Sequence, residues 1–258
     1  MGSDPANKIQ IVAHRGASGY APETTLEAYR LALEMAVDFV EMDIHRLRDG
    51  TLVAIHDPDV KRTTNGKGRL AELTLPELKA MDAGSWFNEA HPEKARPEYV
   101  GLKVPTLQEL LDLIEKSSTG CYIEIKDPER YPPDLESKLL SLIQKKGLEN
   151  RTRILSFSAE SVSKIKRLAP SIQTAFLISR RWKNPVEATL RVPADELALR
   201  HDLATGAIVH SAHESGLTVS VWTVDQEEDL RRMIRLGVDR IITNYPDRLQ
   251  TLLRNFES

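Results

Sequence analysis

The chain has 258 residues, 41% of them hydrophobic and 28% charged, and its 35 basic and 38 acidic residues give a net charge of −3. This near-balance argues against a nucleic-acid-binding surface over the whole protein, and no apolar run approaches the roughly 20 residues of a membrane-spanning helix. The single cysteine, Cys121, excludes an intrachain disulfide and fits a reducing compartment. We therefore expect a soluble protein with no nucleic-acid partner and no stable membrane insertion, and a homo-oligomer stays open.

The first residues, Met1 to Pro5, do not combine a charged stretch with an apolar one, as an export leader would. We therefore expect a cytoplasmic protein, although a leader that had already been removed would leave the same pattern. Residues 1–7 are expected to be a disordered or tag-derived extension that takes no part in the fold.

From Ile9 onward, short apolar runs alternate with amphipathic segments. The runs that we predict as strands are Gln10–His14, Phe39–Ile44, Cys121–Lys126, Arg153–Phe157, Thr174–Ile178, Glu196–Leu199, Thr218–Val224 and Arg240–Thr243. The segments that we predict as helices are Leu26–Ala36, Leu107–Glu115, Leu135–Lys146, Ala159–Leu168, Val186–Leu190, Leu203–Ser215, Gln226–Leu236 and Asp247–Leu253.

Such repeated alternation of strand and helix is typical of a parallel sheet with helical crossovers. About eight units are the number that closes an α/β fold into a (β/α)8 TIM barrel, so we predict one barrel domain over residues 8–258. An open doubly wound sheet is the alternative. No glycine-rich nucleotide-binding motif follows any predicted strand, which weakens that alternative.

One stretch, residues 57–105, is too long for an ordinary connection between a strand and a helix. It is rich in turn-forming residues, among them Gly66 and Gly84, and it also carries Trp86 and Phe87. Because these aromatic side chains and several leucines can bury one another, we predict a small folded insertion after the second strand rather than a loose surface loop.

Polar residues occupy positions where a barrel interior is usually apolar. Alternate side chains of a barrel strand face the interior and the surrounding helices. In the predicted strand Phe39–Ile44, Val40 and Met42 share one face, whereas Glu41 and Asp43 share the other. Because neighbouring buried carboxylates repel one another and lose hydration, we expect positive charge beside them.

The predicted strand Cys121–Lys126 repeats this pattern, with Glu124 and Lys126 on its polar face. The two strands belong to consecutive units if the predicted insertion is set aside, so that Glu124 converges with Glu41 and Asp43. Three carboxylate ligands suit one divalent cation, Mg²⁺ or Ca²⁺, better than zinc. The alternative is that each carboxylate forms an ion pair with a nearby basic residue.

Two histidines end apolar runs of the chain. His14 is followed by Arg15 and Gly16, and His56 is followed by Asp57, which is suited to orient its ring. A histidine can move protons near neutral pH, and an arginine offers a planar fork to phosphate. Either histidine alone is more typical of a turn, but two of them beside an acidic cluster indicate a general acid and a general base.

Trp222 lies in the predicted strand Thr218–Val224, on the face that we expect to point inward. Its ring is suited to bind the apolar or hydroxylated part of a substrate, and packing in the core is an equally good interpretation. The remaining histidines, including His45 and His210, receive no role.

Together these residues resemble the glycerophosphodiester phosphodiesterase family. The matching segments, in the family's order over nearly the whole chain, are His14–Gly16, Ala21–Thr25, Glu41–Asp43, His56–Asp57, Arg62–Gly68, Val104–Leu110, Tyr122–Lys126, Val221–Val224 and Thr243–Asp247. Each segment alone is a weak signal, whereas the ordered set is a strong one. Thr24 stands where the family usually has asparagine, and we expect it still to cap the following helix, so that the change stays local.

The resemblance implies a TIM barrel with a small insertion and a metal-dependent hydrolysis of glycerophosphodiesters to glycerol 3-phosphate and an alcohol. The residues that it implies for the site are Glu41, Asp43 and Glu124 for the divalent cation, His14 and His56 for acid–base catalysis, and Arg15 and Lys126 for the phosphate. Trp222 completes the expected substrate-binding residues, and Glu23 is a further candidate.

Two other functions are alternatives. A lysophospholipase D would use the same site on acylated glycerophosphodiesters, but the sequence has neither a membrane-binding amphipathic helix nor a polybasic run. A catalytically silent barrel would only bind phosphorylated ligands, and the complete set of histidines, carboxylates and cations argues against it. The expected partner is therefore a small glycerophosphodiester, such as glycerophosphocholine or glycerophosphoethanolamine.

Overall fold

The computed structural model describes residues 9–257, apart from 128, 130 and 133. Its strands are β1 (Gln10–Ala13), β2 (Phe39–Arg46), β3 (Leu52–Ala54), β4 (Gly120–Ile125), β5 (Thr152–Ser156), β6 (Gln173–Ile178), β7 (Glu196–Arg200), β8 (Thr218–Trp222) and β9 (Arg240–Thr243). The predicted N-terminal extension, residues 1–7, lies outside the described residues.

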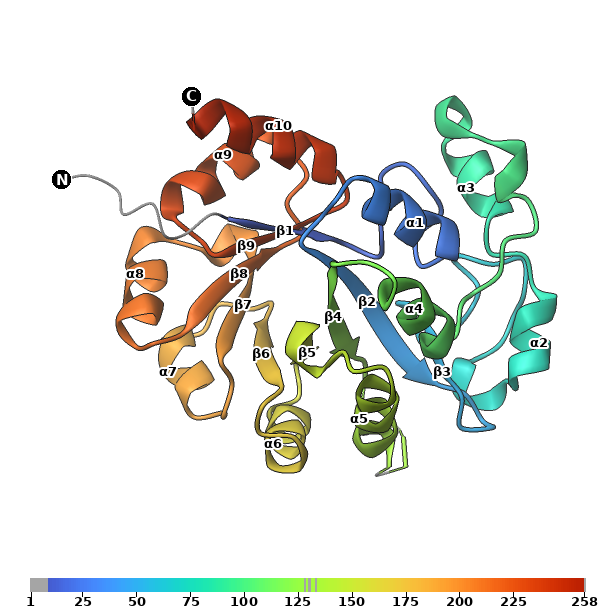
Figure 1. Ribbon diagram of the computed structural model, residues 1–258, viewed down its shortest axis with the longest axis horizontal. Helices are drawn as coiled ribbons and strands as arrows, with labels where there is room; N and C mark the ends of the chain where they lie inside the picture. The colour runs from blue at the N-terminus through green and yellow to red at the C-terminus, as the bar shows by residue number, and fades with distance from the viewer. Residues whose placement is uncertain (1–8, 128, 130, 133, 258) are drawn as a thin grey trace.

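The strands form a ring in the order β1, β9, β8, β7, β6, β5, β4, β2, and parallel pairing of β1 with β2 closes it (Figure 1). Closure excludes the open doubly wound sheet and confirms the (β/α)8 TIM barrel. β3 stands apart, because it pairs antiparallel with the far end of β2. The sequence pattern does not predict β3, since its three residues are too few to show an alternation.

The register of the ring decides which side chains meet. β2 pairs with β4 over six residue pairs, and Asp43 lies directly opposite Glu124. β1 meets β2 over only two residue pairs. The carboxyl ends of β1, β2 and β4 therefore lie side by side, and the residues that follow them share one end of the barrel.

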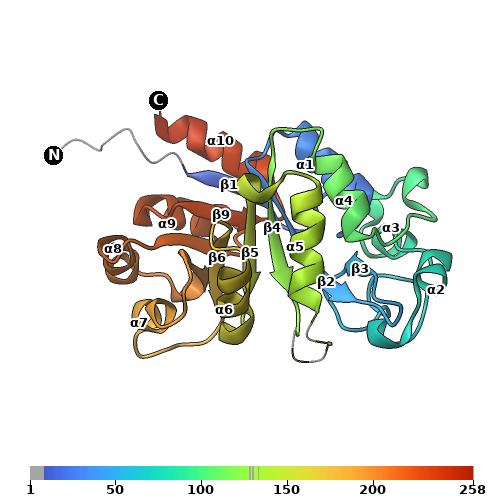
Figure 2. The same cartoon turned by 60° about the horizontal axis from the view of Figure 1, so that its bottom comes forward.

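Helices follow the strands as crossovers and surround the ring, with α5 and α6 lying over β4 and β5 in Figure 2. They are α1 (Leu26–Glu34), α4 (Leu107–Ile114), α5 (Leu135–Lys145), α6 (Ala159–Leu168), α7 (Pro185–Leu190), α8 (Gly206–Glu214), α9 (Glu227–Leu236) and α10 (Pro246–Glu257). Their ends are fixed locally: Thr106 and Glu109 form a capping box at the start of α4, and Gly237 ends α9 with φ 69°. Among the described helices, none has both the length and the apolarity that crossing a membrane requires.

Residues 57–105 lie beside β3, at the right of Figure 1, as a packed segment with little regular structure. Its helical pieces are α2 (Leu75–Ala80), α3 (Ser85–Ala90) and the 3-10 turns Leu70–Glu72, Pro92–Lys94 and Pro97–Tyr99. One buried apolar cluster surrounds Leu70, and a second joins Phe87 and Tyr99 to Ala28 of α1. The segment therefore packs against α1 as well as against β3.

The barrel interior holds an apolar layer and, where the strands begin, a charged cluster. The apolar layer consists of Val12, Tyr122, Leu155, Ala175, Leu177, Ala198 and Ile242. Glu196 is fully buried and accepts hydrogen bonds from Arg240 Nη1 at 3.0 Å and from the Tyr122 hydroxyl at 2.9 Å. Arg153 Nη1 lies 3.9 Å from the same carboxylate. We call these four residues (Glu196, Tyr122, Arg240 and Arg153) the lower cluster.

Candidate active site

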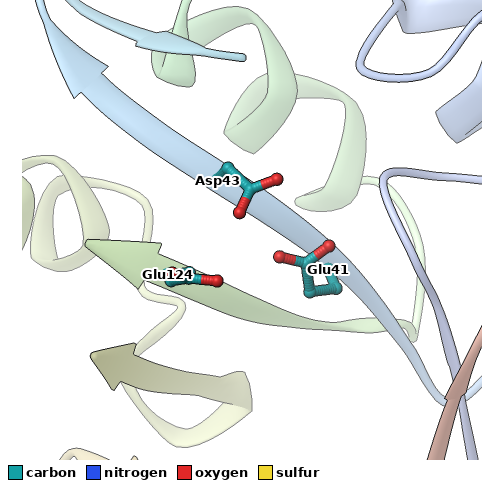
Figure 3. Close-up of side chains that lie close together, drawn as sticks. All are labelled: Glu41, Asp43 and Glu124. Carbon is teal, nitrogen blue, oxygen red and sulfur yellow. The ribbon is translucent and has the colours of Figure 1, made fainter. Parts of the chain in front are cut away.

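Three carboxylates from the neighbouring strands β2 and β4 lie close together, as Figure 3 shows. Glu41 and Asp43 come from β2 and are 3% and 1% exposed, and Glu124 comes from β4. One oxygen of each carboxylate lies within 4.8 Å of the others. The structure thus brings together the three acids that the strand pattern placed on inward faces, and a set of oxygens alone fits Mg²⁺ or Ca²⁺.

Arg15 follows β1 and reaches these acids from the neighbouring strand. Its Nε lies 3.0 Å from Asp43 Oδ2, and its backbone N–H donates to Glu41 Oε2 at 3.1 Å. The turn is tight, since Arg15 has φ 56° and a Cβ at Gly16 would lie 2.6 Å from the backbone of Ala28. Glycine at this position therefore lets Arg15 present both its N–H and its guanidinium to the acids.

Lys126 directly follows β4 on the other side of the acids. Its Nζ lies 2.9 Å from Glu124 Oε1 and 3.5 Å from Asp43 Oδ1. We call Glu41, Asp43, Glu124, Arg15 and Lys126 the upper cluster. Three carboxylates face two cations in it, which leaves one negative charge in excess when all five groups are ionised.

The pKa values of the three acids differ in direction: those of Glu41 and Glu124 are raised, and that of Asp43 is lowered. Burial, together with the charge of Asp43, raises the pKa of Glu41 well above its usual range and that of Glu124 to about 8. Burial alone would also raise the pKa of Asp43, but the charges of Arg15 and Lys126 hold it well below its usual range. A bound cation would favour the charged form of all three acids.

His14 directly follows β1, and its Nε2 lies 3.9 Å from Glu41 Oε2. Its Nδ1 lies 2.7 Å from Asn244 Oδ1, while the amide nitrogen of Asn244 donates to Asp225 at 2.6 Å. Because the amide oxygen can only accept, Nδ1 carries the ring proton and Nε2 keeps a free lone pair on the side of the acids. Burial, and then the charge of Arg15, lower the pKa of His14 to about 4, so the ring is neutral at neutral pH.

His56 is the second residue after β3. Its Nδ1 donates to Asp57 Oδ1 at 2.6 Å, and its carbonyl accepts a hydrogen bond from His45 Nε2 at 3.1 Å. Burial lowers the pKa of His56, whereas the charge of Asp43 acts to raise it. The N–H of the preceding residue, Ile55, donates to the carbonyl of Asp43 at 3.0 Å, so His56 follows directly on a backbone contact with the upper cluster. His45, for which the sequence pattern predicts no role, thus holds the backbone of His56.

Trp222 ends β8 and packs against the apolar layer of the interior. Its ring meets Phe157 edge to face at 5.8 Å between centroids, and its Nε1–H donates to the carbonyl of Ala198 at 3.3 Å. Phe157 also lines a cavity of about 530 Å³ that reaches Glu124 and Lys126. The aromatic pair Phe157 and Trp222 therefore lies at the cavity that reaches the upper cluster.

The model of the glycerophosphoryl diester phosphodiesterase family matches residues 14–248. A glycerophosphodiester phosphodiesterase of Bacillus subtilis (strain 168) is 41% identical over 256 residues, covering 93% of this chain and 85% of the relative. The chain belongs to the glycerophosphoryl diester phosphodiesterase family. Another glycerophosphodiester phosphodiesterase, from Caldanaerobacter subterraneus subsp. tengcongensis, is 36% identical over 247 residues and covers 96% of this chain and 98% of its own.

Solved structures of glycerophosphoryl diester phosphodiesterase relatives share the fold. A phosphodiesterase from Oleispira antarctica, in complex with the product sn-glycerol-3-phosphate, has a TM-score of 0.87 at 27% identity over 95% of this chain and 96% of that chain. A glycerophosphodiester phosphodiesterase from Agrobacterium tumefaciens has a TM-score of 0.79 at 29% identity, covering 94% of this chain and 99% of that chain. The family and the enzyme class expected from the sequence are confirmed by these matches.

One expectation about the family's sequence pattern is wrong. Thr25, not Thr24, caps α1, and its hydroxyl accepts from the N–H of Ala28 at 3.4 Å. Thr24 instead has φ 54°, and its N–H donates to the carbonyl of Arg15 at 3.1 Å. A helix cap needs an extended backbone, which Thr24 does not have. Asparagine tolerates the left-handed region better than branched threonine, which explains the family's usual residue.

Two polar residues contact the predicted site residues, although the sequence pattern predicts no role for them. Asn244, which orients His14, directly follows β9, so the strand-end rule that found His14 could also have found it. Arg62 donates to both Asp57 and the further candidate Glu23. No periodicity indicates Arg62, because its contacts depend on how residues 57–105 pack.

Proposed function

We propose that this protein hydrolyses glycerophosphodiesters, such as glycerophosphocholine or glycerophosphoethanolamine, to glycerol 3-phosphate and an alcohol. The observation that carries the proposal is the convergence of three carboxylates, two cations and His14 where the strands of the barrel end, with His56 following Ile55, whose N–H donates to the carbonyl of Asp43. Active sites of TIM-barrel enzymes lie at this end of the fold. The family match and the names of the relatives support the same reaction.

Glu41, Asp43 and Glu124 would hold one divalent cation, Mg²⁺ or Ca²⁺. The fit is supported by the negative charge that the surrounding protein does not compensate and by the raised pKa values of Glu41 and Glu124. When bound, such an ion polarises a phosphoryl oxygen and stabilises the charge that develops on it.

Arg15 and Lys126 flank the acids and would bind the phosphate. A guanidinium offers paired N–H donors and an ammonium a point charge, and both are most effective where water is excluded. Trp222 and Phe157 would contact the remainder of the substrate. The complex of the Oleispira antarctica phosphodiesterase with sn-glycerol-3-phosphate supports glycerol 3-phosphate as the product of the site.

We assign His14 as the general base and His56 as the general acid, from their hydrogen-bond partners. The free lone pair of His14 Nε2 can accept a proton from the nucleophile, which is water or the 2-hydroxyl group of the substrate's own glycerol. His56 would act in its protonated form: its Nδ1–H donates a hydrogen bond to Asp57, whose charge favours that form against the effect of burial, and its Nε2–H can then protonate the leaving alcohol. Proton transfers of this kind contribute about 10²–10⁴-fold each.

Release of glycerol 3-phosphate from a panel of glycerophosphodiesters, in EDTA and after return of Mg²⁺ or Ca²⁺, tests the proposal. We expect turnover to stop in EDTA and to recover with the ion. Equal turnover in EDTA would contradict the role of the metal. Faster turnover of lysophosphatidylcholine than of glycerophosphocholine would favour the lysophospholipase D alternative.

Histidine variants test the acid–base assignment. His14→Ala and His56→Ala are each expected to lose about 100-fold or more in kcat. His210→Ala, which removes an exposed histidine of α8, is the matched control and should keep wild-type turnover. Near-wild-type turnover by both His14→Ala and His56→Ala would contradict two-histidine catalysis.

A further inference from the structure

A continuous chain of charged side chains runs beside the upper cluster and ends at His56. Arg15 Nη1 donates to Glu23 Oε1 at 2.9 Å. Glu23 accepts in turn from Arg62, whose Nη1 and Nη2 lie 2.9 and 2.8 Å from its two oxygens. Arg62 Nε donates to Asp57 Oδ2 at 2.6 Å, and the other oxygen of Asp57 accepts from His56 Nδ1 at 2.6 Å.

The contacts of Arg62 separate its role from that of a phosphate ligand. Each of its three nitrogens already donates to a carboxylate oxygen of Glu23 or Asp57. A guanidinium is planar, so two carboxylates bound along its edges are held at a fixed separation and orientation. Arg62 is therefore built to fix one carboxylate relative to another.

Of the two carboxylates that Arg62 contacts, Glu23 is held more firmly than Asp57. Its side chain is 13% exposed and is also held by Arg15, whereas the side chains of Asp57 and His56 are 26% and 34% exposed. Among the described residues, only Arg62 and His56 hold the Asp57 carboxylate. Without the guanidinium, the charges of Glu23 and Asp57 would repel each other, and Asp57 would move away with the ring that it holds.

We propose that Arg62 is a positioning residue, which braces Asp57 against Glu23 so that His56 presents its Nε2 to the leaving group. This inference rests on the role of His56 in the proposed function. The segment of residues 57–105 supplies both Asp57 and Arg62, whereas Glu23 comes from the connection between β1 and α1. The acid–base group on one side of the site is thus aligned with the phosphate-binding group on the other.

Kinetics of Arg62 variants give the first test, with the metal-loaded protein and glycerophosphocholine. Arg62→Ala is expected to lower kcat on the order of 10- to 100-fold, less than complete loss of a proton-transfer group. KM and inhibition by glycerol 3-phosphate should stay within about threefold, because uniform substrate binding is untouched. Arg62→Lys should be intermediate, since an ammonium lacks the planar fork that holds both carboxylates.

The matched control is Arg48→Ala, which removes an exposed arginine whose Nη2 lies 3.4 Å from Glu77. It should keep wild-type kcat and KM. Wild-type kcat in Arg62→Ala would overturn the proposal, and so would a rise in KM that accounts for the whole loss, because Arg62 would then bind substrate directly.

A double variant tests whether Arg62 acts through His56. If it does, Arg62→Ala lowers kcat no further in the His56→Ala background. Multiplication of the two single losses in the double variant would overturn the proposal.

The Nδ1–H signal of His56 in protein with ¹⁵N-labelled histidine gives a readout that does not depend on turnover. The signal should be lost or broadened in Arg62→Ala as in Asp57→Ala, and kept in Arg48→Ala. Retention in Arg62→Ala would overturn the positioning role. Failure of the wild-type protein to hydrolyse any glycerophosphodiester would instead refute the proposed function, while this signal still decides whether Arg62 positions the ring.

Discussion

The two ends of the barrel interior both hold buried charges, but the charges are balanced in opposite ways. In the lower cluster one carboxylate, Glu196, faces two arginines and also accepts a hydrogen bond from Tyr122. In the upper cluster three carboxylates face two cations. The lower cluster thus has positive charge in excess, and its single carboxylate is paired and hydrogen-bonded, whereas the upper cluster has negative charge in excess. The end of the barrel that carries the candidate site therefore differs from the other end by its excess of negative charge, and not simply by having buried charges.

The backbone differs between the two ends as well. Arg15, Thr24 and Asp127 have φ values of 56°, 54° and 41°, and all three lie in segments that follow β1 or β4 beside the upper cluster. Only Ala36 is a further residue of this kind among the described non-glycine residues. Such conformations cost on the order of 1–3 kcal/mol each, so surrounding contacts must hold the upper end in place.

Glu41→Gln should separate activity from stability at the upper end. Burial raises the pKa of Glu41, so above its ordinary pKa of 4.5 the charged form destabilises the folded protein. Glutamine removes this charge and keeps an oxygen to accept from the N–H of Arg15. We expect kcat/KM to fall on the order of 10³-fold, with an unchanged or higher Tm in EDTA at pH 7. A clear fall in Tm would contradict an uncompensated upper cluster.

Glu196→Gln should have the opposite effect at the lower end. It leaves Arg240, whose side chain is 8% exposed, without its counter-charge. Breaking a buried pair on one side typically costs about 3–5 kcal/mol of unfolding free energy. We expect this loss in thermal or urea unfolding, with wild-type kcat below the transition. Loss of kcat without loss of stability would mean that the lower cluster serves catalysis.

Metal binding should stabilise only through the upper end. A ligand at about 100 times its Kd adds about 2.7 kcal/mol to the free energy of unfolding. Thermal unfolding with and without Mg²⁺ or Ca²⁺ should show this gain for the wild type and for Glu196→Gln, and little of it for Glu41→Gln. An equal gain in Glu41→Gln would place the ion elsewhere.

Thr24→Asn should relieve part of the strain at the upper end. Asparagine is tolerated in the left-handed region where Thr24 lies, so we expect a gain of about 1 kcal/mol. For a chain of this size that corresponds to a rise in Tm of about 2–4 °C, measured by calorimetry. The kcat should not change. A lower Tm would show that the threonine side chain contributes more than its backbone costs.

The sequence predicted the barrel because hydrophobic alternation is local. The segment Arg240–Thr243 coincides with β9, and the inward face of β2 could be recognised from alternation alone. β3 was missed because its existence depends on pairing with the end of β2 rather than on its own three residues.

The site residues also fall into those that local sequence pattern could predict and those that depend on tertiary packing. Glu41 and Glu124 could be placed together, since parallel strands bring their carboxyl ends to one edge. The contact of Arg62 with Asp57 could not be predicted, because it depends on the packing of residues 57–105. Which of two adjacent threonines caps α1 was also out of reach, since the choice is made by φ at Thr24.

Because β1 and β2 pair over a short stretch, closure of the strand ring should depend on whether a ligand is bound at the upper cluster. Only two residue pairs join these strands, whereas six join β2 and β4. The groups proposed to act on phosphate come from both of these strands: His14 and Arg15 follow β1, while Glu41 and Asp43 belong to β2. A ligand that contacts both sets would hold β1 and β2 together. It would slow the separation of these two strands and protect the amides of β1 from hydrogen exchange.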